Sequence, residues 1–270
     1  MSTKPVALIT GASRGIGAAT AVTFAQRGYR TALVARSRQE LEATAKAVSD
    51  AGSEAIVCAG DLADLAFAES AVTQTLQAWG RIDALVNNAA WRELVTMRTI
   101  TLESWEKTLR ICLTAPAFLS RWAAADMEKR GRGAIINISS VMSQQAAGFG
   151  PAYIASKGGL DALTYDLAAL YGPKGIRVVA VNPGAIDTDM SADYTSAEGE
   201  SLSRDIRQWG EDMIPLRRWG TPQEIANVIV WLASDEASYI SGTTIFADGG
   251  WRHQHMLYNL KHRQFPEEFP

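Results

Sequence analysis

The sequence predicts an α/β domain in which a sheet of parallel strands is covered by helices on both faces. Short apolar runs alternate with longer segments of helical periodicity from residue 6 to about residue 246, which is the pattern of repeated β-α units. Glycine and polar residues follow the apolar runs, as expected where parallel strands end at one edge of a sheet. The length of 270 residues and the hydrophobic share of 47% suffice for one large core. We therefore expect a single domain over residues 1–251 and a tail over residues 252–270.

The charge of the chain is nearly balanced, which argues against two classes of partner. The formal net charge is −3 and no run of lysine or arginine occurs, so we expect no binding to nucleic acid or to an anionic membrane. The first apolar run, Val6–Ile9, is too short for a signal or membrane segment and leads directly into a glycine turn. The expected location is the cytoplasm.

The cysteines and histidines lack the spacing of a metal site. Cys58 lies in an expected strand and Cys112 in an expected helix, without a disulfide framework. We expect both thiols to be reduced. His253 and His255 lie two residues apart in the tail, but a full set of ligands is missing, so solvated histidines are favoured over a metal site.

The first β-α unit contains a glycine-rich turn. The run Val6–Ile9 predicts a strand, residues 18–27 predict a helix, and the segment Thr10–Gly17 between them has glycine at positions 11, 15 and 17. Small residues allow the backbone to approach a pyrophosphate, and the start of the helix offers it unpaired N–H groups. An isolated glycine cluster is more often an ordinary turn, but its place between a strand and a helix favours dinucleotide binding.

The second strand, expected over Thr31–Ala35, ends without the acidic residue that often binds the adenosine ribose of NAD. Ala35 is neutral and Arg36 follows it, while Arg14 lies in the glycine turn at the same end of the expected pocket. Guanidinium groups pair with the 2′-phosphate of NADP, whereas a carboxylate accepts a bond from the 2′-hydroxyl of NAD. Either arginine alone is also explained as a solvated surface charge. Their joint position favours NADP(H) over NAD(H).

Two further β-α units carry polar residues at the ends of their strands. The strand over Ala55–Cys58 leads into Asp61, and the strand over Ala84–Val86 leads into Asn87. Parallel strands end at the same edge of a sheet, beside the ligand crevice. We expect Asp61 to contact adenine and Asn87 to brace the neighbouring loops. The alternative is that Asp61 or Asp64 only caps the next helix.

The fifth strand and the helix after it bring together residues suited to acid–base chemistry. The strand over Ala134–Ile138 delivers Ser140 to the crevice, where its hydroxyl can polarise a substrate carbonyl. Pro151 opens a helix in which Tyr153 and Lys157 share one face, because they are four residues apart. A phenol with an ordinary pKa of ~10 is a poor acid or base at neutral pH, and a nearby ammonium lowers such a pKa. On spacing alone, a surface pair and a serine turn are the alternatives.

The last units provide a further strand end, a lid and the closing strand. The strand over Arg177–Val181 opens into a loop that reaches Thr188, which we expect to hold the nicotinamide amide. Residues 189–214 are polar and weakly periodic, which indicates a helical lid or insertion on the substrate side. A helix over residues 222–232 and a strand over residues 243–246 complete the domain.

Taken together, these motifs make the chain resemble the short-chain dehydrogenase/reductase family from about Lys4 to Trp251, nearly its whole length. The motifs follow one another in the order and at the spacings of that family. The resemblance implies a doubly wound, Rossmann-like domain with a seven-stranded parallel sheet. It also implies a homotetramer, or a homodimer, packed through the helices that bear Cys112 and Tyr153. The motifs that carry it are the Thr10–Gly17 turn, Asp61, Asn87-Asn88-Ala89, Ser140, Tyr153 with Lys157, Pro183-Gly184, and Thr188.

The resemblance further implies the roles of the site residues. Tyr153 would be the general acid/base and Ser140 would orient the substrate oxygen. Lys157 would bind the nicotinamide ribose and favour the ionised form of the phenol, while hydride moves between nicotinamide and the substrate carbon. The residues implied to bind the cofactor are Gly11, Ser13, Arg14, Gly15, Ile16, Gly17, Arg36, Asp61, Leu62, Asn88, Ala89, Tyr153, Lys157, Pro183, Gly184, Ile186 and Thr188.

Two positions depart from the family pattern. Ala90 stands where the motif usually ends in glycine, and it adds a methyl group near the nicotinamide ribose. Cys112 stands at the fourth catalytic position, where similar proteins carry an asparagine that assists a proton relay from the lysine to solvent. Pro116 cannot donate a helical bond to the Cys112 carbonyl, so we expect a bend there and a water that links this carbonyl to Lys157. The alternative is that Pro116 bends the helix only for packing.

The expected activity is the NADP(H)-dependent interconversion of a carbonyl and an alcohol. The substrate stays open among ketones, 3-oxoacyl thioesters, sugars and steroids. Trp91, Met142 and Met190 near strand ends indicate an apolar pocket, although such residues are more often core. A rival interpretation is a sensor or structural subunit that binds NADP without turnover. Cys112 favours this rival, whereas the acid–base trio argues against it.

The tail carries Met256, Leu257 and Leu260 on what would be one face of a short helix. We expect it to pack over the pocket or against a neighbouring subunit. The alternative is a disordered tail, since its end is polar and contains proline.

Overall fold

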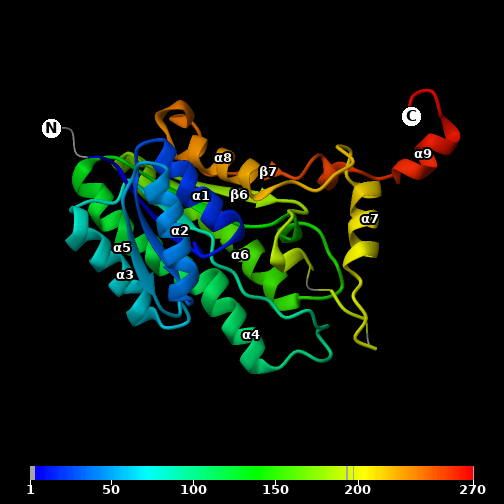
Figure 1. Cartoon of the computed structure of the whole chain (residues 1–270), viewed down its shortest axis with the longest axis horizontal. Coiled ribbons are helices and arrows are strands. Elements are labelled where there is room, and N and C mark those ends of the chain that lie inside the picture. The colour runs from blue at the N-terminus through cyan, green and yellow to red at the C-terminus, as the bar shows by residue number, and fades with distance from the viewer. Residues whose placement is uncertain (1–3, 193, 197, 270) are drawn as a thin grey trace.

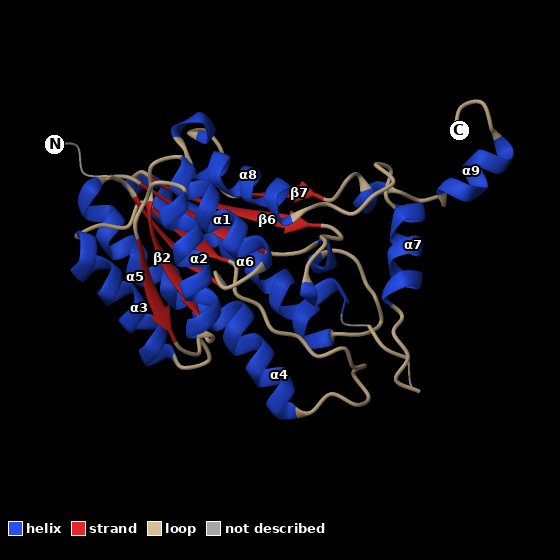
Figure 2. Ribbon diagram, viewed as in Figure 1, coloured by secondary structure: helices blue, strands red, loops and turns tan. Residues whose placement is uncertain are grey.

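The computed structural model describes residues 4–192, 194–196 and 198–269. Seven strands form one parallel sheet in the order β3-β2-β1-β4-β5-β6-β7. Helices lie on both faces of it (Figure 1, Figure 2), so the predicted fold class and the seven strands are confirmed. The strands are β1 (Val6–Thr10), β2 (Arg30–Ala35), β3 (Ala55–Ala59), β4 (Ala84–Asn87), β5 (Gly133–Ile138), β6 (Ile176–Pro183) and β7 (Thr243–Ala247).

Two layers of helices cover the sheet. Helices α1 (Gly15–Gln26), α2 (Arg38–Asp50) and α8 (Pro222–Ala233) pack with one face of the strands in one buried apolar cluster. Helices α3 (Leu65–Trp79), α5 (Ala115–Arg130) and α6 (Pro151–Tyr171) pack with the opposite face in a second cluster. The remaining elements are α4 (Leu102–Leu109), α7 (Ser203–Met213), α9 (Tyr258–Gln264), the π-helical turn η1 (Arg110–Thr114), and the short 3₁₀ turns η2 (Val141–Ser143), η3 (Gly172–Lys174), η4 (Asp189–Ala192), η5 (Asp235–Ala237) and η6 (Trp251–His253).

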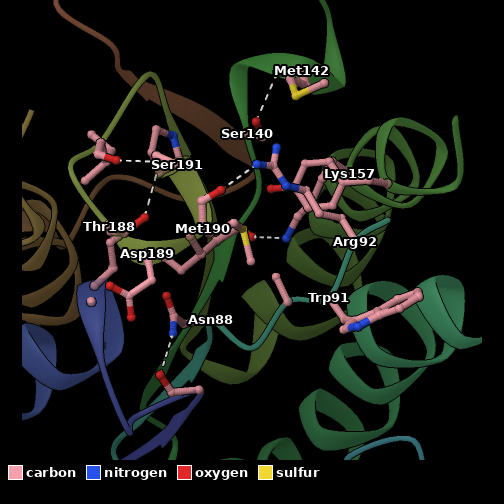
Figure 3. A pocket seen from close by; sticks show the side chains of 18 of the residues that line it. Asn88, Trp91, Arg92, Ser140, Met142, Lys157, Thr188, Asp189, Met190 and Ser191 are labelled. Atoms are coloured by element: carbon pink, nitrogen blue, oxygen red, sulfur yellow. Dashed lines mark hydrogen bonds between the residues drawn. The ribbon is translucent and has the colours of Figure 1, made fainter. Parts of the chain in front are cut away.

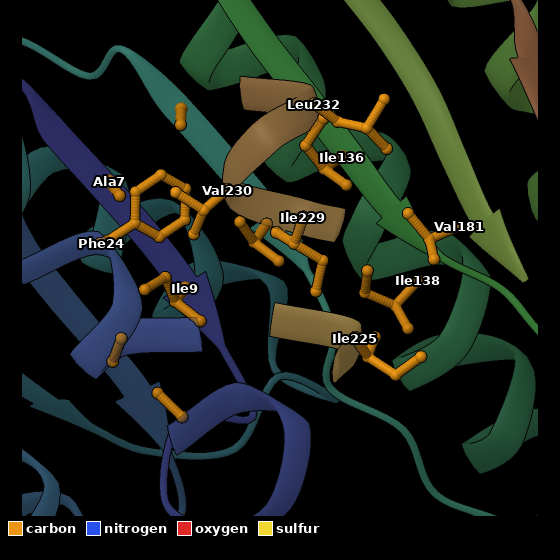
Figure 4. Close-up of a cluster of buried hydrophobic side chains, with 14 of the residues drawn as sticks. Ala7, Ile9, Phe24, Ile136, Ile138, Val181, Ile225, Ile229, Val230 and Leu232 are labelled. Carbon is orange, nitrogen blue, oxygen red and sulfur yellow. The ribbon is translucent and has the colours of Figure 1, made fainter. Parts of the chain in front are cut away.

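The strands are mostly apolar, and those in the middle of the sheet are buried on both faces. In β1, Ala7 and Ile9 belong to the first cluster and Leu8 belongs to the second, as expected when successive side chains point to opposite faces. Figure 4 shows the first cluster, in which Phe24 of α1 and Ile229 of α8 lie over the strands. The apolar runs of the sequence therefore predict strands at the correct places.

The order of the strands puts the ligand crevice between two neighbours. Strand β1 pairs with β2 on one side and with β4 on the other, so the sheet grows in opposite directions from this point. Ligands bind at the carboxyl ends of the strands beside such a switch point. The glycine turn after β1 and the Asn87-Asn88-Ala89 segment after β4 meet there, since the Asn88 N–H donates to the Thr10 hydroxyl at 2.9 Å.

The lid and the tail lie together at one end of the molecule. Within the expected lid, residues 189–192 form η4 and residues 203–213 form α7, with loops between them. The tail helix α9 begins at Tyr258, so Met256 and Leu257 precede it instead of lying on its face. The Asn259 N–H donates to Asp212 of α7 at 2.9 Å, and Figure 1 shows α9 next to α7 and away from the sheet. None of the helices in the described part of the chain has the length and hydropathy needed to cross a membrane.

Candidate active site

A cavity of about 1270 Å³ opens at the carboxyl ends of the strands. Its wall is formed by the loops that follow six strands, β1 to β6, and by parts of α6 and α7. Sites for a single drug-sized ligand measure roughly 300–1,000 Å³. The cavity therefore has room for a dinucleotide and a second small molecule.

The glycine turn forms one end of the cavity. Gly11 and Gly15 line it with φ angles of 65° and 55°, in the left-handed region where glycine is favoured. A Cβ atom on Gly11 would lie 2.9 Å from the Cα of Ala89, so only glycine fits. The N-cap of α1, Arg14, makes no side-chain cap bond, and the first turn of that helix contains no acid. The N–H groups of this helix start are thus open to an anion, which fits a dinucleotide pyrophosphate.

Gly17, which is predicted to bind the cofactor, has a packing role in the structure. It is buried beneath the turn and does not line the cavity. A Cβ atom there would lie 2.1 Å from the Gly11 carbonyl oxygen, so the residue allows α1 to pack closely under the turn. Asn88 holds the same turn, because its side-chain amide donates to the Thr10 and Gly11 carbonyls at 2.9 and 3.2 Å.

The end of β2 supplies the part of the cavity expected to hold the adenosine. Ala35 and the exposed Arg36 line it, as does Arg14. Arg14 also forms an ion pair with Asp189 at 3.3 Å, and both side chains are largely exposed. Such a pair contributes little in water, so a phosphate can compete for this guanidinium. Asp61 lines the same region, and its carboxylate accepts from the Ala63 N–H at 2.9 Å.

The predicted helix cap at this edge belongs to Asp64. Its side chain accepts from the Ala66 N–H at 2.9 Å and starts α3. The two aspartates that follow β3 therefore have different roles. Asp64 caps α3, and Asp61 lines the cavity.

Ser140, Tyr153 and Lys157 line the same cavity as the glycine turn. Lys157 is only 2% exposed, and its ammonium donates to the Ile138 carbonyl at 2.7 Å and lies 5.4 Å from the centre of the Tyr153 ring. The Ser140 hydroxyl oxygen accepts from the Met142 N–H at 3.1 Å, which leaves its proton for another acceptor. The end of β5 and the first turns of α6 thus bring the trio together.

Two asparagines hold these strand ends in place. Asn182, near the end of β6, donates through its side chain to the Ser140 carbonyl at 3.1 Å and to Asp161 of α6 at 3.0 Å. The sequence analysis does not single out this residue, because an asparagine in an apolar strand has no motif of its own. Asn87 donates to Asn137 at 2.8 Å and to Ser120 at 3.2 Å, so it braces a strand and a helix, not the loops that we expect from the sequence.

The side chain of Cys112 does not line the cavity, and the proton relay through its carbonyl stays a prediction. Cys112 is fully buried, and its thiol accepts from the Trp91 N–H at 3.4 Å and donates to the Trp91 carbonyl at 3.3 Å. The bend expected near Pro116 takes the form of the π-helical turn η1, in which the Ala115 N–H bonds to the Arg110 carbonyl. The extra residue in this turn relieves the crowding that the proline ring would otherwise cause.

The opposite end of the cavity is rich in aromatic side chains. The predicted pocket residues Trp91, Met142 and Met190 all line it. The rings of Phe149 and Tyr194 meet edge to face. Side chains missed by the sequence analysis contribute most of this wall, because they come from the lid and from loops without periodicity. These are Arg92, Phe149, Tyr194, Trp209, Met213 and Trp219.

Comparison with known proteins agrees with this geometry. A family model described as enoyl-(acyl carrier protein) reductase matches residues 11–252. An uncharacterized oxidoreductase of Thermotoga maritima is 37% identical over 91% of this chain and 94% of its own length. A short-chain reductase of Streptomyces niveus is 34% identical over 93% of this chain and 95% of its own. The crystal structure of a levodione reductase superposes with a TM-score of 0.87 at 33% identity, covering 94% of this chain and 99% of that one. The chain therefore belongs to the short-chain dehydrogenase/reductase family, oxidoreductases that use a nicotinamide dinucleotide, NAD(H) or NADP(H).

Proposed function

We propose that this protein is an NADP(H)-dependent oxidoreductase that interconverts a carbonyl and an alcohol. The observation that carries the proposal is the position of Ser140, Tyr153 and Lys157 on the wall of the cavity that also contains the open glycine turn. An acid–base group and a dinucleotide cradle in one cavity are the parts that hydride transfer to a carbonyl needs.

Each side chain of the trio has a separate task in this proposal. When bound, the nicotinamide supplies the hydride in reduction and accepts it in oxidation. In reduction, the Tyr153 phenol gives its proton to the carbonyl oxygen as the carbonyl becomes an alcohol, and in oxidation it takes that proton back. The Ser140 hydroxyl donates to the same oxygen, since its own oxygen already accepts from Met142. The buried Lys157 ammonium, 5.4 Å from the centre of the Tyr153 ring, binds the ribose of the nicotinamide nucleotide.

The preference for NADP(H) rests on the end of β2. Arg36 follows neutral Ala35, and Arg14 lies across the same part of the cavity. Two guanidinium groups suit a phosphate better than a hydroxyl, and no carboxylate stands at the last residue of β2 to bind the ribose of NAD.

The lining favours a ketone with an apolar body as the substrate. Trp91, Met142 and Met190 line the cavity beside Trp209 and Trp251, whose rings meet edge to face at 5.8 Å. Apolar and aromatic walls bind apolar groups and leave orientation to a few polar contacts. The solved relative named as a levodione reductase supports a carbonyl substrate.

The proposal extends to assembly and location. Phe118 of α5 and Tyr165 and Leu170 of α6 are exposed, which supports packing of these helices against other copies in a homotetramer or homodimer. Cys58 and Cys112 are both free and buried, which supports a reducing compartment such as the cytoplasm. Light scattering on the purified protein measures the number of copies.

Absorbance measurements of NADPH and NADH oxidation over a panel of ketones, oxoacyl thioesters and sugars test the function. We expect turnover with at least one ketone and a preference for NADPH. A protein that binds NADPH but turns over no carbonyl compound would instead be the sensor or structural subunit of the rival interpretation.

A further inference from the structure

One cationic side chain in the cavity is not explained by the proposed reaction. Arg92 follows Trp91 after β4 and lines the cavity on its aromatic side. Figure 3 shows its side chain directed into the cavity toward Met190, at the same end as Ser140 and Lys157. The guanidinium donates to the Met190 carbonyl at 2.5 Å and to the Tyr194 hydroxyl at 3.4 Å, so both partners are neutral.

Among the described residues, the charge of this guanidinium has no counter-ion. No carboxylate of the described residues forms an ion pair with Arg92, although twelve other pairs occur there. Its Nε atom is buried and has no hydrogen-bond partner in the described part of the chain. A buried, unpaired donor costs about 1–3 kcal/mol, and more when it is charged. A buried donor without a partner is often completed by a bound ligand.

Three carboxylates in the described part of the chain line the cavity, those of Glu40, Asp61 and Asp189, and none of them pairs with Arg92. Asp189 pairs with Arg14, and Asp61 accepts from the Ala63 N–H. The surroundings of Arg92 are instead aromatic: its guanidinium carbon lies 5.3 Å from the centre of the Tyr194 ring, and Trp91 precedes it in the chain. Arg92 is half-buried, so an ion pair formed there is weakened less by water than one on the open surface.

We propose that Arg92 binds a carboxylate of the substrate. The substrate class is then an oxo acid, or the matching hydroxy acid, with an apolar or aromatic body that fills the cavity between the lid and α6. The planar guanidinium has five N–H donors and binds a carboxylate through two of them. This inference rests on the proposed function, because it names the substrate class of the same site, and it adds no chemical step.

Two other roles of Arg92 can be distinguished from substrate binding by experiment. It contacts the lid through Met190 and Tyr194, so it could act only as a latch for the lid. It could also bind a phosphate of the cofactor. A latch lowers activity on charged and neutral substrates alike, and a phosphate contact changes cofactor affinity. Only a substrate contact changes the ratio between an acid and its ester.

The experiment compares oxo acids with their methyl esters, which differ in one negative charge. Benzoylformate, benzoylacetate and benzoylpropionate carry the acid at three distances from the ketone, and kcat/KM with NADPH is measured for each acid and each ester. We expect the wild type to prefer at least one acid by about tenfold or more. Arg92→Met should lower that acid-to-ester ratio by about tenfold or more, and Arg92→Lys should retain part of it because lysine keeps the charge but not the planar fork.

Arg98→Met is the matched control. Arg98 is an exposed arginine of the same loop that does not line the cavity, so its loss should leave the ratio unchanged. A wild type that prefers the ester for all three compounds overturns the inference. So does an Arg92→Met variant that loses acid and ester activity equally, or one whose only change is weaker NADPH binding.

A binding measurement separates failure of this inference from failure of the proposed function. Trp91, Trp209 and Trp251 line the cavity, so quenching of tryptophan fluorescence reports occupancy without turnover. With NADP⁺ present, the wild type should bind benzoylpropionate at least about tenfold more tightly than its methyl ester, and Arg92→Met should not. If no ketone is reduced but this difference holds, the anion site stands and the proposed reaction fails. If ketones are reduced and acid and ester bind equally, the anion site fails alone.

Discussion

At the scale of single residues, substitutions of Tyr153 and of Lys157 are expected to have different effects on turnover and on cofactor binding. The phenol acts only on the reacting oxygen, so Tyr153→Phe should lower kcat by about a hundredfold or more and leave NADPH binding nearly intact. Lys157 is expected to hold the ribose as well, so Lys157→Ala should weaken turnover and cofactor binding together. Steady-state kinetics and NADPH titration measure the two effects.

Tyr165→Phe is the control for this pair of variants. Tyr165 lies on the same helix α6, but it is 44% exposed and outside the cavity, so removal of its hydroxyl should change neither quantity. Full activity of Tyr153→Phe on a good substrate would contradict the role given to the phenol.

Cofactor choice is the second residue-scale prediction. The wild type should bind NADPH roughly ten to a hundred times more tightly than NADH, the contribution of one or two partly exposed phosphate pairs. Arg36→Asp should reverse the preference, because a carboxylate repels the phosphate and accepts from the ribose hydroxyl. Arg38→Asp is the control, since Arg38 lies two residues further on and does not line the cavity. Equal binding of NADH and NADPH to the unaltered protein would disprove this assignment.

Part of the cavity wall can be predicted from the sequence because these residues belong to motifs with a physical purpose. Gly11 has a positive φ angle, Ser140 lies two residues after the end of β5, and Thr188 lies in the loop that follows β6. Arg92 belongs to no motif, and an arginine in a loop is usually a surface charge. Its burial depends on Tyr194 and Met190, about a hundred residues away. Only the folded chain brings these groups together.

At the scale of secondary structure, the segment from α4 to α5 shows how a proline is accommodated inside a long helix. Pro116 lacks the N–H that would bond to Cys112. The π-helical turn η1 places Cys112 so that its thiol spans both backbone groups of Trp91. The proline predicts that the helix is irregular here. It is compatible with a simple bend and with a π-helical turn, so it does not select between them. The choice between them depends on packing against the loop after β4.

Cys112→Asn should therefore change kcat by less than about threefold. An asparagine amide has a donor and an acceptor, so it can make both contacts with Trp91 that the thiol makes. Cys112→Ala loses both contacts and should raise KM, because Trp91 lines the substrate end of the cavity. A gain of two orders of magnitude in kcat for Cys112→Asn would mean that the native cysteine limits proton exchange.

The lid helix α7 and the tail helix α9 are in contact. This contact gives a second prediction at the scale of secondary structure. Helix α7 lines the cavity through Trp209 and Met213. The tail contacts α7 through Asn259, and it contacts the loop after α7 through Tyr258, whose ring lies 3.8 Å from the Arg217 guanidinium carbon. Deletion of residues 253–270 should raise KM several-fold with a smaller change in kcat, because the lid loses a support and the acid–base trio does not.

Unchanged kinetics and unchanged oligomer size by light scattering would show that the tail has no such role. Arg217→Met removes the contact with Tyr258 and keeps the tail, so it should show part of the same rise in KM. The helix in the lid is predictable from the sequence, but its late start at Ser203 is not. Gly199 adopts a φ angle of 86° in the preceding loop, and glycine in this conformation interrupts a helix.

At the scale of the whole molecule, the two ends of the sheet have different tasks. The carboxyl ends of the strands form the cavity. Few of the ion pairs there have mostly buried side chains. The opposite end is held by a network around Asp83, which accepts from the Val6 N–H at 2.8 Å and pairs with Arg81 at 2.6 Å and Arg130 at 2.8 Å. Arg130 also pairs with Asp126 at 2.9 Å. This network joins β1, β4 and α5 far from the site of reaction.

The alternation of apolar runs and helical segments predicts all seven strands, but it does not predict their order. Strand β1 pairs with β4, whose first residue lies 78 positions after Val6, and no local pattern encodes such a contact. The order follows from the resemblance to a family and from the rule that parallel crossovers are right-handed. The Asp83 network is equally hidden in the sequence, since the hydrogen-bonded residues Val6 and Asp83 lie 77 positions apart.

Asp83 should make the stability of the protein depend on pH at the acid end. Burial raises the pKa of this carboxyl, but the bonds from Arg81 and from the Val6 N–H, with the charge of Arg130, more than offset burial, so the pKa lies below its ordinary value of 3.8. A carboxyl with a lowered pKa in the folded state contributes stability above its unfolded pKa, and this contribution is lost as the pH falls through the folded value. The free energy of unfolding should therefore decrease below about pH 4.

Asp83→Asn tests this at pH 7 and at about pH 3 by urea denaturation. At pH 7 the variant should lose about 2–4 kcal/mol, because two arginines of low exposure lose their counter-charge while the amide oxygen can still accept from Val6. At pH 3 the difference between variant and wild type should narrow, since the unfolded wild-type chain then binds a proton at Asp83 that the folded carboxyl, with its lowered pKa, resists. Asp235→Asn is the control, because the pair of Asp235 with Arg132 is largely exposed and should make no measurable difference. A loss that is equally large at both pH values would assign the effect of Asp83 to packing and hydrogen bonding instead of its charge.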